Sequence, residues 1–200
     1  MTLTVVTQPP AEPVELAEAK THLRVDFDDH DDYIEGLVKA ARRFAENHTG
    51  TVFIERTLKY TIDAFPELSS EAIIVPVAPI QSISSIIYTD TDGNEQTWSS
   101  DNYILDPDDK RPRILPAYEQ DWPDTRDQIN AVQITMKAGY APLGSPLDYR
   151  TAVPDDIRHA LKMLIGHWYE HGADVAMGTT VVQVPMASLS LLWDYKIKAF

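Results

Sequence analysis

The sequence predicts an α+β fold in which a small helical core, formed by the N- and C-terminal helices, carries an inserted antiparallel β-rich subdomain. Apolar residues recur at helical spacing over Glu15–Gly50 and Val153–Phe200, whereas the segment between them alternates apolar and polar residues and is punctuated by prolines. Because neither terminal piece has enough apolar surface to stand alone, we expect the two to pack on each other. The predicted domains are residues 1–50 with 150–200, and residues 51–149.

The first helices are expected to follow an extended arm. Three prolines within residues 1–14 favour extended backbone, and a short helix is expected over Glu15–Arg24. A longer helix should follow the acidic segment Asp26–Asp32 and run to about His48, and Gly50 suits its end. Two pairs of opposite charge lie four residues apart and are expected on its outer faces, Glu35 with Lys39 and Arg42 with Glu46.

The acidic segment Asp26–Asp32 allows two interpretations. Clustered carboxylates suit Ca²⁺ or Mg²⁺, but the segment lacks the glycine and the distant glutamate of an EF-hand loop. Alternatively, Asp28 or Asp29 caps the following helix, and the other acids favour the positive end of its dipole. We expect the capping role.

Short strands at period two are expected throughout the insert. They are residues 57–63, 72–75, 83–89, 95–98, 103–105, 113–115 and 131–137. Asp92-Gly93 is typical of a hairpin turn between two of these strands. The prolines between the runs fit edge strands and loops, which favours antiparallel pairing.

The C-terminal part returns to helical spacing after a Pro/Gly/Ser loop over Ala141–Thr151. Pro154 and the two aspartates that follow it suit the first turn of a helix, which Gly172 should end. Val175–Val184 is expected to be irregular or extended, and Ser188–Lys196 to form a last helical stretch.

Composition argues against membrane-spanning, disulfide-bonded and DNA-wrapping proteins. The 200 residues include no cysteine, and no apolar run approaches the ~20 residues that span a bilayer, so we expect no membrane partner and no thiolate site. The first residues lack the basic and apolar regions of a signal peptide, which predicts a protein made in a cytoplasm. A net charge of −14 argues against a surface that wraps nucleic acid by counterion release.

One motif suggests catalysis. His167-Trp-Tyr-Glu170-His171 matches H-x-x-E-H, in which two histidines on one helix face hold zinc and the glutamate acts as general base. No third ligand is marked, and Gly172 places His171 at a fraying helix end. Acid groups that a glycosidase would use, Glu67/Glu71 and Asp106/Asp108/Asp109, lie in loop contexts without a flanking pattern. We expect no catalytic, cofactor or metal site, and no cofactor.

The C-terminal tail, residues 185–200, is unusually aromatic and apolar for a chain end. Either it docks on its own core as a last helix, or it anchors the chain to a partner, since Trp and Tyr are enriched at interface hot spots. The candidate anchor residues are Leu191, Leu192, Trp193, Tyr195 and Phe200.

Several of these segments resemble the head–tail connector (adaptor) family of tailed bacteriophages and gene transfer agents. They are Pro13–Val25, the acidic run before Tyr33, Ala40–Gly50, Val153–Leu161, Gly166–Glu170 and Leu191–Tyr195. The order and spacing of these segments carry the resemblance, which covers nearly the whole chain. The strand-rich middle matches the longer members of the family.

The resemblance implies a virion structural protein in the neck of a phage or phage-like particle, assembled in the bacterial cytoplasm. It implies that the protein associates with itself into a ring, for which we expect twelve copies. The ring would dock on the portal protein through the C-terminal tail, and a stopper or tail-completion protein would then bind to the ring. Double-stranded DNA would pass through the channel without sequence-specific binding, and net acidity would let it slide. The isolated protein is expected to be a monomer in which the tail and residues 172–184 become ordered only on assembly.

Two alternatives of other classes stay open. A zinc-dependent hydrolase would use His167, Glu170 and His171, and would lose stoichiometric zinc on His167→Ala. A carbohydrate- or receptor-binding module built on the β subdomain would expose Trp98 or Trp122 on a shallow sheet face.

Overall fold

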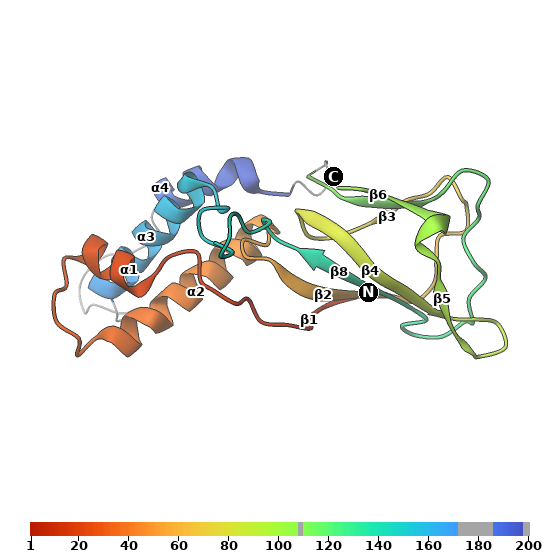
Figure 1. The fold of residues 1–200 in the computed structure, drawn as a ribbon, viewed down its shortest axis with the longest axis horizontal. Coiled ribbons are helices and arrows are strands. Elements are labelled where there is room, and N and C mark those ends of the chain that lie inside the picture. Colours follow the sequence, from red (N-terminus) through yellow and green to blue (C-terminus); the bar gives the residue numbers. More distant parts are fainter. Residues whose placement is uncertain (108–109, 172–185, 198–200) are drawn as a thin grey trace, which may run out of the picture. The chain divides into compact units, whose positions relative to one another are not determined.

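Helices from both ends of the chain pack together, as the sequence predicts (Figure 1). The computed structural model describes residues 1–107, 110–171 and 186–197. The described residues of Ala11–Ile54 and Pro142–Lys196 form one compact unit, here the helical unit. Those of Met1–Pro10 and Glu55–Ala141, with Ile197, form a second, the sheet unit. No helix among the described residues is long and apolar enough to cross a membrane.

The helical unit contains α1 (Leu16–Leu23), α2 (Asp31–Thr49), α3 (Asp155–Glu170), α4 (Met186–Leu192) and the short 3₁₀ helix η2 (Trp193–Tyr195). Helix α3 contacts α1, α2 and α4, so it lies at the centre of the unit. Apolar side chains at helical spacing fill the core between α2 and α3: Ile34, Ala41, Ala45, Ile157, Leu161, Leu164 and Ile165. This contact confirms the predicted helical core built from the two ends of the chain.

Helix α2 ends as predicted but begins differently. Gly50 adopts φ 75°, and its N–H donates to the Glu46 carbonyl at 2.8 Å. At the other end His30 occupies the N-cap position and no side chain caps the helix, so the prediction that Asp28 or Asp29 does so is wrong. Asp28 instead accepts a hydrogen bond from Lys20 Nζ at 2.7 Å, because α1 brings this charged donor within its reach.

The two predicted ion pairs of α2 differ in their surroundings. The Glu35–Lys39 pair is exposed, with 3.5 Å between its charged atoms. The Arg42–Glu46 pair is 2.9 Å long but buried, with both residues 7% exposed, so the prediction that it lies on an outer face is wrong. The guanidinium faces inward because a second carboxylate, Glu12 of the N-terminal arm, meets its Nε at 2.6 Å.

The Arg42 network also fixes the backbone that leaves α2. Glu46 Oε1 accepts the Phe53 N–H at 2.9 Å, and Phe53 and Ile54 are fully buried. Burial alone would lower the pKa of Arg42, but the carboxylates of Glu12 and Glu46 more than offset it and raise the pKa. The guanidinium therefore stays charged and joins the arm to α2, and Glu46 joins α2 to the segment that leaves it.

The sheet unit holds eight strands among its described residues. They are β1 (Thr2–Val5), β2 (Arg56–Ile62), β3 (Ile73–Ile74), β4 (Ile80–Thr89), β5 (Glu95–Trp98), β6 (Tyr103–Asp106), β7 (Arg113–Pro116) and β8 (Val132–Ala138). One sheet has the order β1-β2-β8-β4-β5 and the other β3-β7-β6. Every pairing between these strands is antiparallel, as predicted.

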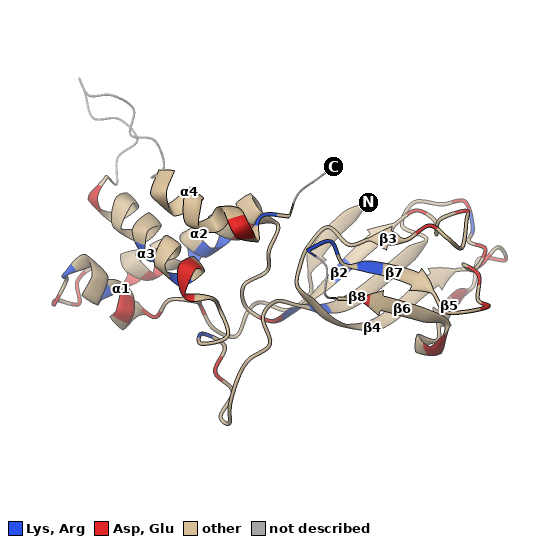
Figure 2. Ribbon diagram, turned by 90° about the horizontal axis from the view of Figure 1, so that it is seen from above, with Lys and Arg blue, Asp and Glu red and all other residues tan. Residues whose placement is uncertain are grey.

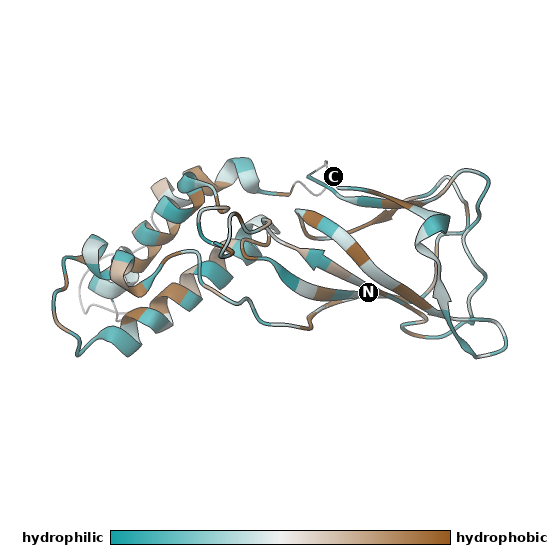
Figure 3. Ribbon diagram, in the orientation of Figure 1, coloured by the Kyte–Doolittle hydropathy of each residue, from teal (hydrophilic) through white to brown (hydrophobic). Residues whose placement is uncertain are grey.

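Alternation places one face of each long strand in the core. Strand β2 buries Leu58, Tyr60 and Ile62 and leaves the residues between them half-buried. In Figure 3, brown apolar bands recur along β4 with paler bands between them. Between β4 and β5, Gly93 has φ 90° and its N–H donates to the Asp90 carbonyl at 3.0 Å, which confirms the predicted hairpin.

The N-terminal residues correct one prediction. Thr2–Val5 forms an edge strand on β2, with Thr2 opposite Thr61 and Val5 opposite Leu58. Residues 1–10 therefore belong to the sheet unit rather than to the helical core or to a free arm. The physical reason is that the alternating Thr-Leu-Thr-Val run suits an extended strand, and the prolines that follow it do not interrupt the pairing.

Two histidines of the helical unit have lowered pKa values. Partial burial, together with the charges of Lys162 and His159, lowers the pKa of His22. Burial and the charge of Lys196 lower the pKa of His48. In the folded state both imidazoles therefore resist protonation more than they do in the unfolded chain.

Removing the buried guanidinium should destabilise the helical unit strongly. We expect Arg42→Met to lower the free energy of unfolding by about 3 to 5 kcal/mol, because the carboxylates of Glu12 and Glu46 lose the buried guanidinium that both of them bind. Denaturant unfolding followed by far-UV circular dichroism measures this loss. The exposed neighbour provides the control: Arg43→Met should change the same quantity by less than about 0.5 kcal/mol. Equal effects of the two variants would contradict the central role of Arg42.

The two histidines predict a loss of stability in mild acid. Below about pH 6.5, the unfolded chain takes up protons that His22 and His48 refuse in the folded state, so stability falls. The midpoint of urea unfolding should therefore be lower at about pH 5.5 than at about pH 7.5. The His22→Gln/His48→Gln variant should show a smaller difference, whereas Asn47→Gln should keep the full one. An undiminished difference in the histidine variant would refute the assignment.

Candidate functional site

The C-terminal tail docks on its own helical unit in the described residues. Helix α4 contacts α3, and Leu192 at its end is fully buried. Leu191 is half-buried beside it. Leu192 therefore contributes to the core of this chain, and its side chain is not accessible to a partner in this conformation.

Backbone and side-chain hydrogen bonds hold the residues after α4 in place. Thr51 Oγ1 donates to the Tyr195 carbonyl at 2.6 Å, which joins the tail to the segment that leaves α2. Burial, the nearby carboxylates of Asp156 and Asp194, and a hydrogen bond with Asp156 raise the pKa of the Tyr195 hydroxyl. Tyr195 therefore serves the attachment of the tail to the unit.

Trp193 is the predicted anchor residue that stays open to solvent. Its side chain is 60% exposed between the buried Leu192 and the attached Tyr195, and Lys196 Nζ lies 5.9 Å from its ring centroid. Met186, at the start of α4, is 75% exposed. Phe200, the last predicted anchor, lies outside the described residues. The tail thus presents a large aromatic surface on a segment that is itself firmly held.

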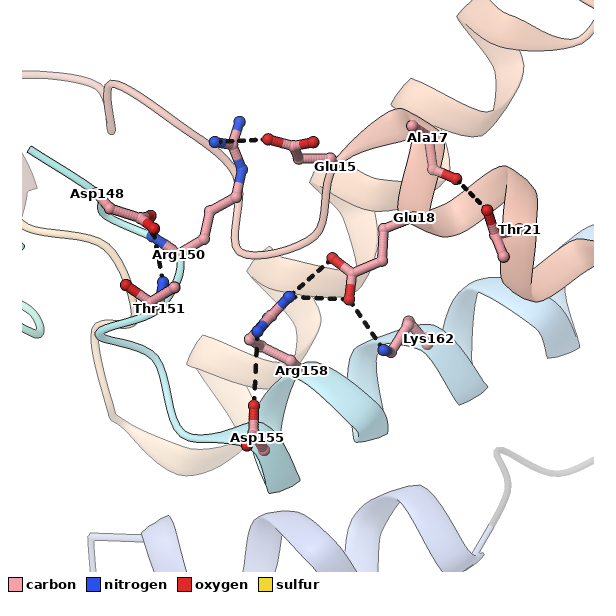
Figure 4. A network of polar contacts seen from close by, with 10 residues as sticks. All are labelled: Glu15, Ala17, Glu18, Thr21, Asp148, Arg150, Thr151, Asp155, Arg158 and Lys162. Carbon is pink, nitrogen blue, oxygen red and sulfur yellow. Dashed lines mark hydrogen bonds and ion pairs between the residues drawn. The ribbon is translucent and has the colours of Figure 1, made fainter. Parts of the chain in front are cut away.

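Ion pairs fix α1 on α3 next to this core (Figure 4). Glu18 of α1 accepts hydrogen bonds from Arg158 at 2.9 and 3.0 Å and from Lys162 at 3.0 Å. Burial would raise the pKa of Glu18, but these two cations outweigh it and lower the pKa. The carboxylate is therefore ionised at neutral pH, and its role is to join helices from the two ends of the chain.

The surface between α1 and the 142–151 loop is hollowed but its charges are paired. Arg150 Nη1 lies 2.8 Å from Glu15 Oε1, and both residues line two open hollows of about 400 and 450 Å³. Asp148 accepts the backbone N–H groups of Arg150 and Thr151, which lower its pKa. These contacts shape the loop, and each charged group named here already serves a structural contact.

The zinc-like motif lies at the end of α3. The rings of His167 and His171 are stacked with centroids 4.9 Å apart, and the Nδ1 of His171 lies 3.0 Å from the His167 carbonyl oxygen. Within the described ranges, no three histidine, cysteine or acidic side chains come together in a way that could hold a metal ion. The motif therefore receives no third ligand from the described part of the chain. The side chains of Asp26–Asp32 do not form such a group of three either, within the same residues.

Among the described residues, the loop carboxylates that a glycosidase would use are exposed or engaged in a structural contact. Asp106 accepts a hydrogen bond from Arg113 on the neighbouring strand at 2.6 Å, and Glu67 and Glu71 are exposed. Asp108 and Asp109 lie outside the described residues. The acids that sequence alone brings together thus have separate surroundings.

The tryptophans of the sheet unit are buried in an aromatic cluster. Trp98 is 7% exposed and Trp122 8% exposed, with their ring centroids 5.1 Å apart. Trp122 stacks on Phe65 at 5.2 Å, and Trp98 lies 5.4 Å from Tyr103 of the second sheet. The exposed tryptophan that a carbohydrate-binding face requires is therefore absent at both predicted positions, because these rings fill the core between the sheets.

Solved structures with the same fold come from neck and virion assemblies. The chain is 24% identical to a chain from the neck of an empty GTA particle computed with C6 symmetry (TM-score 0.80), and 24% identical to one from the virion of a native gene transfer agent particle (0.79). It is 22% identical to a chain from the neck of a native GTA particle computed with C12 symmetry (0.76). Each match covers 100% of this chain and 97% of the other, so the fold is shared from end to end.

No curated protein matches the sequence. Residues 13–105 match the family model of phage gp6-like head–tail connector proteins. This match begins in the N-terminal arm and includes α1, α2 and the first half of the sheet unit. Residues 13–105 therefore resemble the gp6-like head–tail connector proteins, in agreement with the family predicted from the sequence motifs.

Proposed function

We propose that the protein is a structural head–tail connector that forms a ring between the portal and the next neck or tail component and lets DNA pass. The observation that carries the proposal is the fold shared along the whole chain with components of gene transfer agent necks and virions, one of these necks computed with C12 symmetry. The family match over residues 13–105 supports the same role independently. On this proposal the protein acts by its shape and contacts rather than by catalysis, and twelve copies close the ring.

The exposed tail residue supplies the contact with the portal. Trp193 lies between the buried Leu192 and the attached Tyr195, so its backbone is already ordered and only the side chain has freedom to lose on binding. Large aromatic side chains that become buried at an interface contribute strongly to affinity. We assign the portal contact to Trp193, with the half-buried Leu191 beside it and Phe200 further along the tail.

Charge suits a channel that DNA crosses without binding. The net charge of −14 is spread over both units, as the acidic segments in Figure 2 show. An acidic surface repels the phosphate backbone, so DNA would not bind to the channel surface of a ring of such subunits. A stopper or tail-completion protein would occupy the face opposite the portal.

Docking on the portal tests the function and the tail contact separately. Mixed with the portal ring of its parent particle, the natural protein should give a second ring stacked on the portal in electron microscopy. Trp193→Ala should weaken docking by about 2 kcal/mol or more, because an aromatic anchor is lost. Its unfolding midpoint should stay unchanged, since the side chain is exposed.

Tyr118→Ala is the matched control, because Tyr118 is 87% exposed in the sheet unit and its loss should leave docking intact. If the natural protein forms no ring on the portal, the proposed function fails. If a ring forms and Trp193→Ala docks equally well, only the tail assignment fails.

Acidity predicts that the protein does not retain DNA. Linear double-stranded DNA should migrate unchanged in a gel at about 0.15 M salt with the protein present, because a protein with a net charge of −14 repels the phosphate backbone. The measurement is repeated on the portal-bound ring, where the channel is assembled. A shift that is lost at higher salt would contradict the proposed acidic bore.

A further inference from the structure

An exposed group of aromatic side chains lies at one end of the helical unit, where the loop between α1 and α2 meets the end of α3 (Figure 1). This aromatic patch consists of Phe27, His30, Tyr33 and Tyr169. Phe27 is 44% exposed and Tyr33 47% exposed, so large parts of both rings face solvent. The patch does not include any residue of the tail contact proposed above.

The rings are arranged against one another rather than scattered. Phe27 meets His30 edge-on with centroids 5.0 Å apart, and Tyr169 lies 5.8 Å from His30 and 6.0 Å from Tyr33. Tyr169 OH and His30 Nδ1 share a hydrogen bond of 2.7 Å. Because this bond joins α3 to the loop before α2, the patch is a pre-formed surface and little ordering is needed for a ligand to bind it.

Acidic residues flank the patch in the sequence. Asp26, Asp29 and Asp32 are exposed and alternate along the chain with the ring residues of the loop, and the exposed Glu170 directly follows Tyr169. The nearby cations are Lys20, which already pairs with Asp28 and Asp31 at 2.7 Å, and the exposed Arg24. The local charge is therefore negative around an aromatic centre.

We propose that the aromatic patch binds an arginine-bearing segment of another protein chain. A guanidinium group stacks on aromatic faces and pairs with carboxylates at the same time, so rings surrounded by aspartates offer both of its preferred contacts. DNA does not fit, because the aspartates repel phosphate. A symmetric contact with the same patch of a second copy does not fit either, because it would bring like charges together.

A peptide of alternating arginine and leucine, labelled with a fluorophore, serves as the probe. Its binding to the full-length protein is followed by fluorescence anisotropy at about 0.15 M salt, with the same peptide carrying glutamate for arginine as the reference. We expect the arginine peptide to bind and the glutamate peptide not to bind. Phe27→Ala/Tyr33→Ala should weaken binding about tenfold without changing the net charge, which separates the patch from the general acidity of the protein.

Two further variants sharpen the result. Asp29→Asn/Asp32→Asn should weaken binding and reduce its dependence on salt, whereas Tyr118→Ala should bind as the natural protein does. Far-UV circular dichroism checks that each variant is folded. Undiminished binding in Phe27→Ala/Tyr33→Ala, or an equal loss in Tyr118→Ala, would overturn the proposal. A change in the oligomeric state of the protein alone on removing Phe27 and Tyr33 would also overturn it, since the occupant would then be a second copy.

Discussion

The buried guanidinium of Arg42 is the contact on which the helical unit depends. It is bound by Glu12 from the N-terminal arm and by Glu46 one turn further along α2, and Glu46 in turn accepts the backbone N–H of Phe53. The arm, α2 and the segment after it are therefore joined through this one network of Glu12, Arg42 and Glu46. A buried ion pair does not of itself add much stability. Loss of one partner is nevertheless costly, because the other charge then stays buried without the ion pair that compensated its desolvation. The network thus specifies where the arm enters and where the chain leaves.

Helices from the two ends of the chain are joined by a second polar contact. Glu18 of α1 binds Arg158 and Lys162 of α3, and the apolar faces of α2 and α3 meet beside it. Hydrophobic burial provides most of the driving force here, because the apolar side chains between α2 and α3 are fully removed from water. The ion pairs add direction, since they are satisfied in one register of α1 on α3. A chain built in this way carries its whole β-rich middle between Ile54 and Pro142.

Contacts within the chain also decide which residues of the tail are buried and which are exposed to a partner. Leu192 and Tyr195 are used to dock the tail on its own unit, and this leaves the Trp193 ring exposed on a backbone that is already held in place. Such a residue is well suited to recognition, because its backbone does not have to be ordered when the partner binds. The proposed connector role draws on this arrangement and on the acidity of the chain, and neither requires a catalytic group.

The sequence by itself determined the fold class, the helical core at the two ends, most of the strands, the hairpin at Gly93 and the resemblance to the connector family. These follow from local periodicity and turn chemistry, which depend on neighbouring residues alone. Only the tertiary structure decided that Arg42 and Glu46 face inward, that Asp28 pairs with Lys20 instead of capping α2, that residues 2–5 join the sheet, and which tail residues stay exposed. Each of these depends on a partner far away in the sequence, such as Glu12 for Arg42 or β2 for β1. Periodicity predicts on which face of a helix or strand a side chain lies. Which residue that side chain contacts depends on the assembled fold.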